Sequence, residues 1–202
     1  RAVRRDDVNA TPAAPTTPIP QAAASFPLPT LAGRRCTLRP LRAQDAPSLQ
    51  RHADDPEVAF NLFEGFPQPY TLEAAEAWCA HEHRDPLYAH VLGMVVEGDE
   101  VAGCISVTPQ QGLWGASALV GYWLGRSHWG RGVTSEALAM LSAWAWTALP
   151  LPARLWMPIY ARNGASRAVA RKAGYRLEGR LELAVRKDGH AIDAVQYGLT
   201  RP

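Results

Sequence analysis

The sequence predicts a single α/β domain, built on a mixed sheet of about seven strands with flanking helices. Three observations lead to this prediction. The chain has 202 residues, of which 47% are hydrophobic, and this suits one domain with a full core. Extended and helical apolar patterns follow one another in the order β-α-α-β-β-β-α-β-α-β-β. A glycine-rich loop joins a strand to a long helix near the middle of the chain.

Residues 1–32 differ in composition from the rest and are predicted to form a flexible tail, which leaves 33–202 as the folded domain. Proline, alanine and threonine dominate this segment, and such a composition does not bury a core. It lacks the apolar stretch of a secretory signal. An ordered arm that packs on the partner subunit of a homodimer is the alternative interpretation.

The first predicted elements are a strand and a helix. Residues 35–41 alternate between polar and apolar side chains and end at a turn, which is typical of a strand. Asp45 is a candidate N-cap for a helix that runs to about His52, and Asp54-Asp55-Pro56 ends this helix.

A second helix is expected after residues 61–70, a segment dense in aromatic side chains and prolines. Thr71 suits the N-cap of this helix, which runs to about Arg84. Its expected buried face consists of Leu72, Ala75, Trp78 and Cys79. Residues 88–96 and 101–108 then predict a β-hairpin around the turn 97–100.

The central motif is a strand, a glycine loop and a helix. Residues 118–124 form an apolar run that indicates a buried strand, and Gly125, Gly130 and Gly132 follow it. Apolar side chains then recur at helical spacing over residues 134–147. Unpaired N–H groups in the first turn of a helix and the helix dipole attract anions, and glycine removes the Cβ atoms that would keep a phosphate away. The motif therefore predicts a phosphate site.

Two common phosphate-binding motifs do not fit this loop. A P-loop needs Lys-Ser/Thr after its second glycine, whereas Val133-Thr134 stands here. A dinucleotide fingerprint needs glycine or alanine where the chain has Ser135, and an acidic residue at the end of the next strand, residues 154–160, which has none.

The last third of the chain predicts a capped helix and a long hairpin. Asn163 suits the N-cap of the helix and Gly174 its C′ position. The hairpin covers residues 178–199 and turns at Asp188-Gly189.

The glycine loop resembles motif A of the GCN5-related N-acetyltransferases (GNAT), which reads Gln/Arg-x-x-Gly-x-Gly/Ala. Gly130-Arg131-Gly132 match this motif, whereas Ser127 departs from its first position. Gly-Tyr-Trp-Leu before the loop and Asn163-x-x-Ser166 after it are similar to the ribosomal-protein alanine and serine N-acetyltransferase (RimJ/RimL-like) branch. The resemblance covers about 34–200 and implies the GNAT fold, with the sheet splayed between its fourth and fifth strands to admit pantetheine.

The resemblance also implies acetyl-CoA as the co-substrate and assigns residues to it. In the family the glycine loop binds the pyrophosphate, the residue at Asn163 binds the pantetheine amide, and the residue at Ser166 protonates the leaving thiolate. Basic residues downstream are candidates for the phosphates. The cofactor set carried over in this way is Tyr122, Trp123, Leu124, Trp129, Gly130, Arg131, Gly132, Val133, Thr134, Asn163, Ser166, Arg171 and Lys172.

The implied reaction is direct attack of a primary amine on the acetyl carbonyl in a ternary complex, with strand amides near residues 123–124 holding the oxyanion. A general base must take a proton from the amine. Many family members use a glutamate on the strand at 118–124, which has no acidic residue here. Glu64 is our candidate, and Glu182, His128 and an ordered water chain stay open as alternatives.

The loop at 61–70 admits two compatible interpretations. Phe63, Phe66 and Tyr70 cover the core, or, by resemblance, they form the wall that binds the acceptor. The branch suggests a protein or peptide N-terminus as acceptor. A small-molecule amine such as an amino acid, polyamine or antibiotic fits equally well, and a non-catalytic acyl-CoA sensor is a further alternative.

The net charge and the cysteines bear on the possible binding partners, on metal binding and on the cellular compartment. The formal net charge of +2 gives no support for nucleic-acid or membrane binding. Cys36, Cys79 and Cys104 lie far apart without Cys-x-x-Cys spacing, so we expect buried thiols in a reducing, cytoplasmic environment and no metal site.

Overall fold

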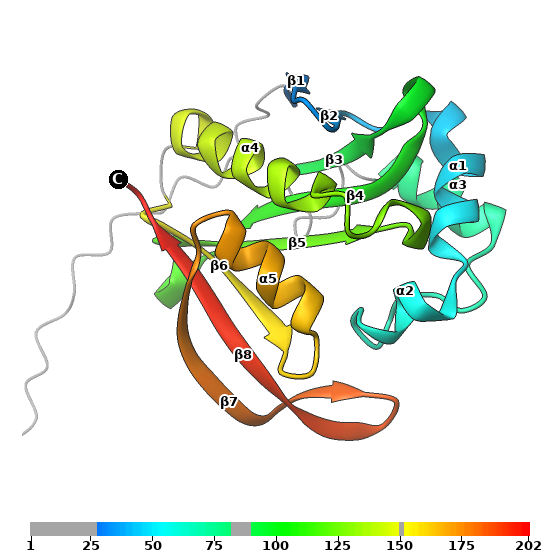
Figure 1. The fold of residues 1–202 in the computed structure, drawn as a ribbon. Helices are drawn as coiled ribbons and strands as arrows, with labels where there is room; N and C mark the ends of the chain where they lie inside the picture. The colour runs from blue at the N-terminus through cyan, green and yellow to red at the C-terminus, as the bar shows by residue number, and fades with distance from the viewer. Residues whose placement is uncertain (1–27, 82–89, 150–151) are drawn as a thin grey trace, which may run out of the picture.

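The computed structural model describes residues 28–81, 90–149 and 152–202, and an open sheet of eight strands forms its centre (Figure 1). The strand order is β1-β2-β3-β4-β5-β6-β8-β7. Strands β5 and β6 run parallel and the other neighbours antiparallel, so the predicted mixed sheet is confirmed. The strands are β1 (Leu31–Ala32), β2 (Thr37–Arg39), β3 (His90–Val95), β4 (Val101–Pro109), β5 (Ser117–Leu124), β6 (Arg154–Tyr160), β7 (Arg176–Lys187) and β8 (His190–Thr200).

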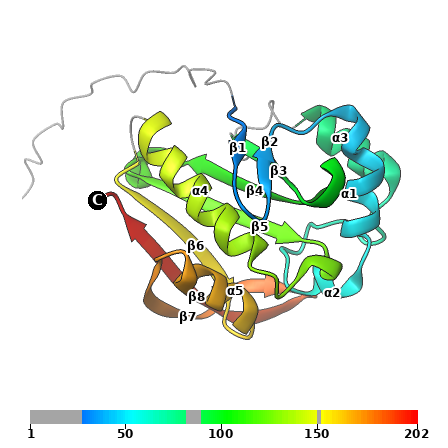
Figure 2. The same cartoon turned by 45° about the horizontal axis from the view of Figure 1, so that its top comes forward.

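Helices cover both faces of the sheet (Figure 2). Helices α4 and α5 pack on one face, and α1 and α3 pack on the other. The α-helices are α1 (Ala46–Ala53), α2 (Pro56–Phe60), α3 (Leu72–His81), α4 (Val133–Ala148) and α5 (Gly164–Lys172), and the short 3₁₀ helices are η1 (Ala43–Asp45), η3 (Glu97–Asp99), η4 (Gly112–Trp114) and η5 (Arg126–His128). No helix within the described ranges is long and apolar enough to span a membrane.

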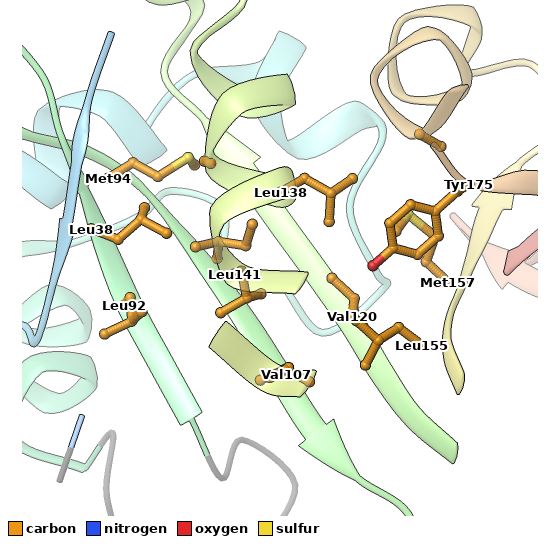
Figure 3. Packing of buried hydrophobic residues seen from close by; sticks show 14 of the residues in the cluster. Leu38, Leu92, Met94, Val107, Val120, Leu138, Leu141, Leu155, Met157 and Tyr175 are labelled. Carbon is orange, nitrogen blue, oxygen red and sulfur yellow. The ribbon is translucent and has the colours of Figure 1, made fainter. Parts of the chain in front are cut away.

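The larger core lies between α4 and the sheet. Leu138 and Leu141 project from α4 toward Val107 and Val120, and Tyr175 closes the core beside α5 (Figure 3). Full burial of each leucine stabilises the fold by about 1.5–3 kcal/mol. This packing fixes the start of α4, and therefore the glycine loop, relative to the end of β5.

Most predicted elements are present within a few residues of their expected ends. Strand β1 is an addition, because Leu31 and Ala32 pair with β2 and so begin the sheet inside the segment whose composition favours a tail. Helix α2 is also new. Asp55 accepts a hydrogen bond from the backbone N–H of Glu57, and Pro56 follows at the first helical position, so the residues expected only to end one helix also begin another.

Two details of the prediction are wrong. Asp45 precedes α1 without capping it, because its carboxylate forms a buried ion pair with Arg39 (2.8 Å) and accepts the backbone N–H of Arg42 (2.7 Å). Leu72 is 42% exposed and does not belong to the buried face of α3. Thr71 does cap α3, since its hydroxyl accepts the N–H of Ala74 at 3.2 Å, whereas the expected end of this helix at 84 lies outside the described residues.

The sheet opens between β5 and β6. Their parallel pairing covers Ser117–Arg154, Ala118–Leu155 and Leu119–Trp156 and ends there. Beyond this point the two strands separate toward their C-terminal ends (Figure 1). The predicted splay between the fourth and fifth expected strands is therefore present, although these strands are β5 and β6 once β1 is counted.

Candidate active site

A cavity of about 1370 Å³ occupies the space where β5 and β6 separate. Its walls come from both strands, the glycine loop, α5, and the segment from α2 to α3. Most of the predicted site residues line it: Phe63, Phe66, Tyr70, Tyr122, Trp123, Leu124, Trp129, Gly130, Gly132, Val133, Thr134, Asn163, Ser166 and Lys172. Glu64, Arg131 and Arg171 are not among the lining residues.

The glycine loop has the geometry of an anion site. Gly130 and Gly132 have φ angles of +75° and +79°, a region that side chains disfavour. No atom lies within 4 Å of the position that a Cβ atom would take at Gly130. The first N–H that bonds within α4 is that of Glu136, to the carbonyl of Gly132, so the N–H groups of the preceding turn are available to a ligand. These groups and the dipole of a 16-residue helix favour a phosphate.

The turn between β1 and β2 supports the glycine loop. Sequence analysis did not indicate this support. Glu136 accepts the backbone N–H groups of Arg34 (3.0 Å) and Arg35 (2.6 Å). The guanidinium of Arg35 donates to the carbonyl of Arg131 (2.8 Å) and lies beside Gly132. A cation that sequence analysis did not select therefore stands beside the glycine loop. The side chain of Arg131 itself points to the surface.

Residues of β5 face opposite sides of the opened sheet. Tyr122 packs toward α4 and α5, whereas Trp123 packs with the α1–α3 side, where its ring meets Phe66 at 6.1 Å. Trp129 folds back over the end of the strand, and its indole N–H donates to the carbonyl of Leu124 at 2.6 Å. The cavity thus extends through the opened sheet, from the glycine loop and α5 on one side to Phe63, Phe66 and Tyr70 on the other.

Helix α5 brings Asn163 and Ser166 to the cavity wall on the same side of the sheet as the glycine loop. The predicted cap is confirmed, because the carboxamide oxygen of Asn163 accepts the N–H of Ser166 at 3.0 Å. Gly174 has a φ of +88°, as expected for the residue after the helix. The hydroxyl of Ser166 lies 2.7 Å from the hydroxyl of Tyr122, and burial raises the pKa of Tyr122 to about 12. The tyrosine is therefore protonated at neutral pH.

Aromatic rings line the other side of the cavity. Phe66 stacks on Tyr70 at 5.1 Å and contacts Phe63 edge-on at 6.1 Å. Tyr70 is 5% exposed and belongs to the core, whereas Phe63 is 53% exposed at the mouth. Both interpretations of this loop are thus compatible with its structure.

Helix α2 closes the mouth against the opposite half of the molecule. The last two carbonyls of α2 and the carbonyl of Leu62, just after it, accept hydrogen bonds from three side chains: Lys187 to Ala59 (3.0 Å), Arg162 to Phe60 (2.9 Å) and Tyr160 to Leu62 (3.0 Å). Glu64 takes part in the same closure, because its carboxylate accepts the N–H of Gly189 at the hairpin tip (3.0 Å).

The titratable groups of the cavity differ from the expected ones. Glu57, at the start of α2, is the one carboxylate among the described lining residues, and sequence analysis did not select it. His128 also lines the cavity, and burial, together with the nearby charges of His52 and Arg131, lowers its pKa. A neutral imidazole can accept a proton. Glu182 is exposed on β7 and does not line the cavity.

The described part of the chain contains no cluster of three His, Cys, Asp or Glu side chains placed to hold a metal ion. The cavity combines a glycine loop at a helix N-terminus, an opening between β5 and β6 and a slot lined by aromatic side chains. This arrangement suits a transferase that holds a phosphate-containing donor at the loop and an acceptor in the slot.

Comparison with known proteins identifies the family. Residues 35–176 match the model of the Acetyltransferase (GNAT) domain, and the chain belongs to this family. It is an acetyl-CoA-dependent N-acetyltransferase. A relative from Bacillus licheniformis, the uncharacterized N-acetyltransferase p20, is 29% identical over 181 residues, which cover 85% of this chain and 96% of that one.

Solved structures of the RimJ/RimL-like branch share the fold, as predicted. RimJ of Mycobacterium smegmatis, in complex with CoA-disulfide, superposes with a TM-score of 0.73 at 26% identity, over 87% of this chain and 88% of that one. RimL, a ribosomal L7/L12 alpha-N-protein acetyltransferase in complex with coenzyme A, superposes with a TM-score of 0.73 at 23% identity, over 85% and 98% of the two chains.

Proposed function

We propose that this enzyme transfers the acetyl group of acetyl-CoA to the N-terminal amine of a protein or peptide, by direct attack in a ternary complex. The observation that carries the proposal is one continuous cavity, which runs from the glycine loop past Asn163 and Ser166 to the aromatic slot. RimL, which shares the fold and is a ribosomal L7/L12 alpha-N-protein acetyltransferase, supports a protein acceptor. The three cysteines are buried thiols, which supports a reducing compartment such as the cytoplasm.

The chain has a candidate binding group for each part of acetyl-CoA, the acetyl donor. The N–H groups at the start of α4, with Arg35 beside them, suit the pyrophosphate. Asn163 has its carboxamide NH₂ left to bind the pantetheine amide, because only its oxygen is used by the helix cap. Lys172 is the lining cation on α5 that suits a phosphate.

The reacting end lies where β5 and β6 separate. Past Leu119, the edge of β5 toward β6 pairs with no strand among the described residues, so its N–H groups are candidates to bind the carbonyl oxygen. Ser166 is the proton donor for the departing sulfur. For the base, Glu64 holds the hairpin tip, so His128 and Glu57, which line the cavity, are the stronger candidates.

The test is thiol release from acetyl-CoA with a panel of amines: peptides with varied N-termini, amino acids, polyamines and aminoglycosides. We expect turnover with peptides, and a loss of about 10²-fold or more in kcat for Ser166→Ala. Turnover with small amines alone would overturn the proposed acceptor. Binding of acetyl-CoA without turnover on any amine would favour the sensor alternative.

A further inference from the structure

We propose that Tyr122 is a positioning residue that directs the hydroxyl proton of Ser166 toward the leaving sulfur. This inference rests on the proposed function. The two hydroxyls belong to residues of β5 and α5, 44 residues apart in sequence, and both residues line the cavity. The oxygen atoms of Tyr122 and Ser166 are 2.7 Å apart, and the Tyr122 hydroxyl is also 3.2 Å from the backbone carbonyl of Ser166.

These two distances define two arrangements of the protons. A hydroxyl has one proton to donate. When Tyr122 donates to the backbone carbonyl, it can accept the proton of Ser166, and that proton then faces the protein. When Tyr122 donates to the Ser166 oxygen instead, the serine proton turns away from Tyr122 and is free for an acceptor in the cavity.

A leaving thiolate favours the second arrangement, because hydrogen bonds to ionised acceptors are stronger than those to neutral ones. As the bond between the acyl carbon and sulfur breaks, its electron pair goes to sulfur, and sulfur accepts the hydrogen bond of Ser166. Tyr122 donates to Ser166 at the same time, which polarises the serine and strengthens its donation. Ser166 passes its proton to the sulfur, the Ser166 oxygen takes the proton of Tyr122, and solvent returns a proton to Tyr122 after the thiol has left.

The surroundings make Tyr122 a donor. Burial keeps the tyrosine protonated throughout the neutral range. Its ring packs against the core beside α4, so the position of its hydroxyl is fixed by packing. The hydroxyl of the neighbouring Tyr175 is bonded to the hydroxyl of Ser142 at 2.9 Å, whereas Ser166 is bonded to Tyr122.

Tyr175 also supplies a matched control. Tyr122→Phe and Tyr175→Phe each remove one buried phenol oxygen that is bonded to a serine. Both variants, Ser166→Ala and the double variant Tyr122→Phe/Ser166→Ala are compared in kcat, in KM for acetyl-CoA and in CoA affinity. We expect Tyr122→Phe to lower kcat about 10-fold, with KM within about twofold of wild type, and Tyr175→Phe to leave kcat within about twofold.

The double variant separates positioning from a structural role. In the Ser166→Ala background, Tyr122→Phe is expected to have no further effect on kcat, because the proton it directs is gone. An equal loss with and without Ser166, or an unchanged kcat in Tyr122→Phe, would overturn the inference while leaving the acetyltransferase proposal intact. Wild type without turnover on any amine would count against the proposed function instead.

A second variant covers the case in which Tyr122→Phe does not fold. Site-specific 2,3-difluorotyrosine at position 122 keeps the shape of the side chain and lowers the pKa of the phenol. We expect its kcat to decline on the alkaline side at a lower pH than that of wild type, since a phenolate cannot donate to Ser166. If kcat declined at the same alkaline pH in both proteins, the inference would be overturned.

Discussion

Single residues decide whether an anion can approach the start of α4. Gly130 is the clearest case, because it combines a positive φ with a place in the cavity wall. A side chain there has two separate effects. It strains the backbone, and it stands where a phosphate would meet the N–H groups.

Gly130→Ala separates these effects when compared with Gly112→Ala. Gly112 also has a positive φ, +58°, and also has no atom within 4 Å of its Cβ position, but it lies in η4 away from the cavity. We expect each variant to lose about 1–2 kcal/mol of unfolding free energy. Only Gly130→Ala should weaken CoA binding in calorimetry, by about tenfold or more. Equal CoA affinities for the two variants would contradict the assignment of the loop.

The features of the site that depend on neighbouring residues could be predicted from the sequence, whereas the contacts between residues far apart in the sequence could not. Gly130, Gly132 and the cap at Asn163 could be predicted, because each depends on the chemistry of a few neighbouring residues. The contacts of Tyr122 with Ser166 and of Arg35 with the loop span 44 and 96 residues, and only the packed fold sets them. A polar side chain carries no local sign of such a partner.

At the scale of elements, α4 connects the glycine loop with the start of the sheet. Glu136, in its first turn, is the link, because one carboxylate accepts two backbone N–H groups from the turn between β1 and β2. Hydrogen bonds to charged groups stabilise more than neutral ones.

Glu136→Ala is therefore expected to lower the unfolding free energy by about 1–3 kcal/mol in urea denaturation. The control is Glu97→Ala, which removes an exposed carboxylate 3.5 Å from Arg131 and should cost less than about 0.5 kcal/mol. Similar losses in the two variants would count against the link.

A histidine on strand β3 makes the free energy of unfolding depend on pH. His90 is 8% exposed, packs edge-on to Trp144 of α4 at 5.5 Å, and has its pKa lowered by burial from an ordinary value of 6.5. Below pH 6.5 the unfolded chain binds a proton that the folded chain resists. The contribution of His90 to stability is thus fully present above pH 6.5 and is lost as the pH falls from 6.5 through the lowered pKa of the folded state.

We expect the unfolding free energy of wild type to fall more steeply than that of His90→Gln between pH 6.5 and the lowered pKa of the folded state. Thermal or urea unfolding at several pH values measures both slopes. The same slope in the two proteins would show that His90 does not titrate differently in the folded state.

The elements themselves were largely predictable. The limits of β6 match the prediction, and the turn at Asp188-Gly189 has positive φ angles at both residues, +52° and +76°, as a tight hairpin requires. The short pieces β1 and α2 were missed because two to five residues give too little pattern. Asp55-Pro56 is also a signal for the start of a helix. We missed it because we interpreted these residues only as the end of the preceding helix.

On the scale of the whole molecule, contacts across the cavity mouth hold its two halves together. Lys187, near the hairpin tip, is 8% exposed and donates to the carbonyl of Ala59 at the end of α2, 128 residues earlier. Arg162 and Tyr160 cap the next carbonyls in the same way. These contacts hold the segment after α2 against β6 and the hairpin, and none of them involves the glycine loop. On the proposed function, they position the wall of the acceptor slot.

Lys187→Met should therefore raise KM for the peptide acceptor several-fold and leave CoA affinity unchanged. Arg201→Met is the matched control, because Arg201 caps the carbonyls of Trp146 and Leu149 at the far end of α4. Each substitution should cost about 1 kcal/mol of stability. A rise in acceptor KM for both variants would indicate general loosening rather than a specific role of α2.

The measurement that tests the central claim most directly is tandem mass spectrometry of a peptide after incubation with acetyl-CoA and enzyme. The peptide carries an unblocked N-terminus and an internal lysine, so both kinds of primary amine compete in one tube. We predict one acetyl group on the N-terminal amine with wild type and strongly reduced acetylation with Ser166→Ala. Acetylation of lysine alone, or equal acetylation by the two proteins, would contradict the account.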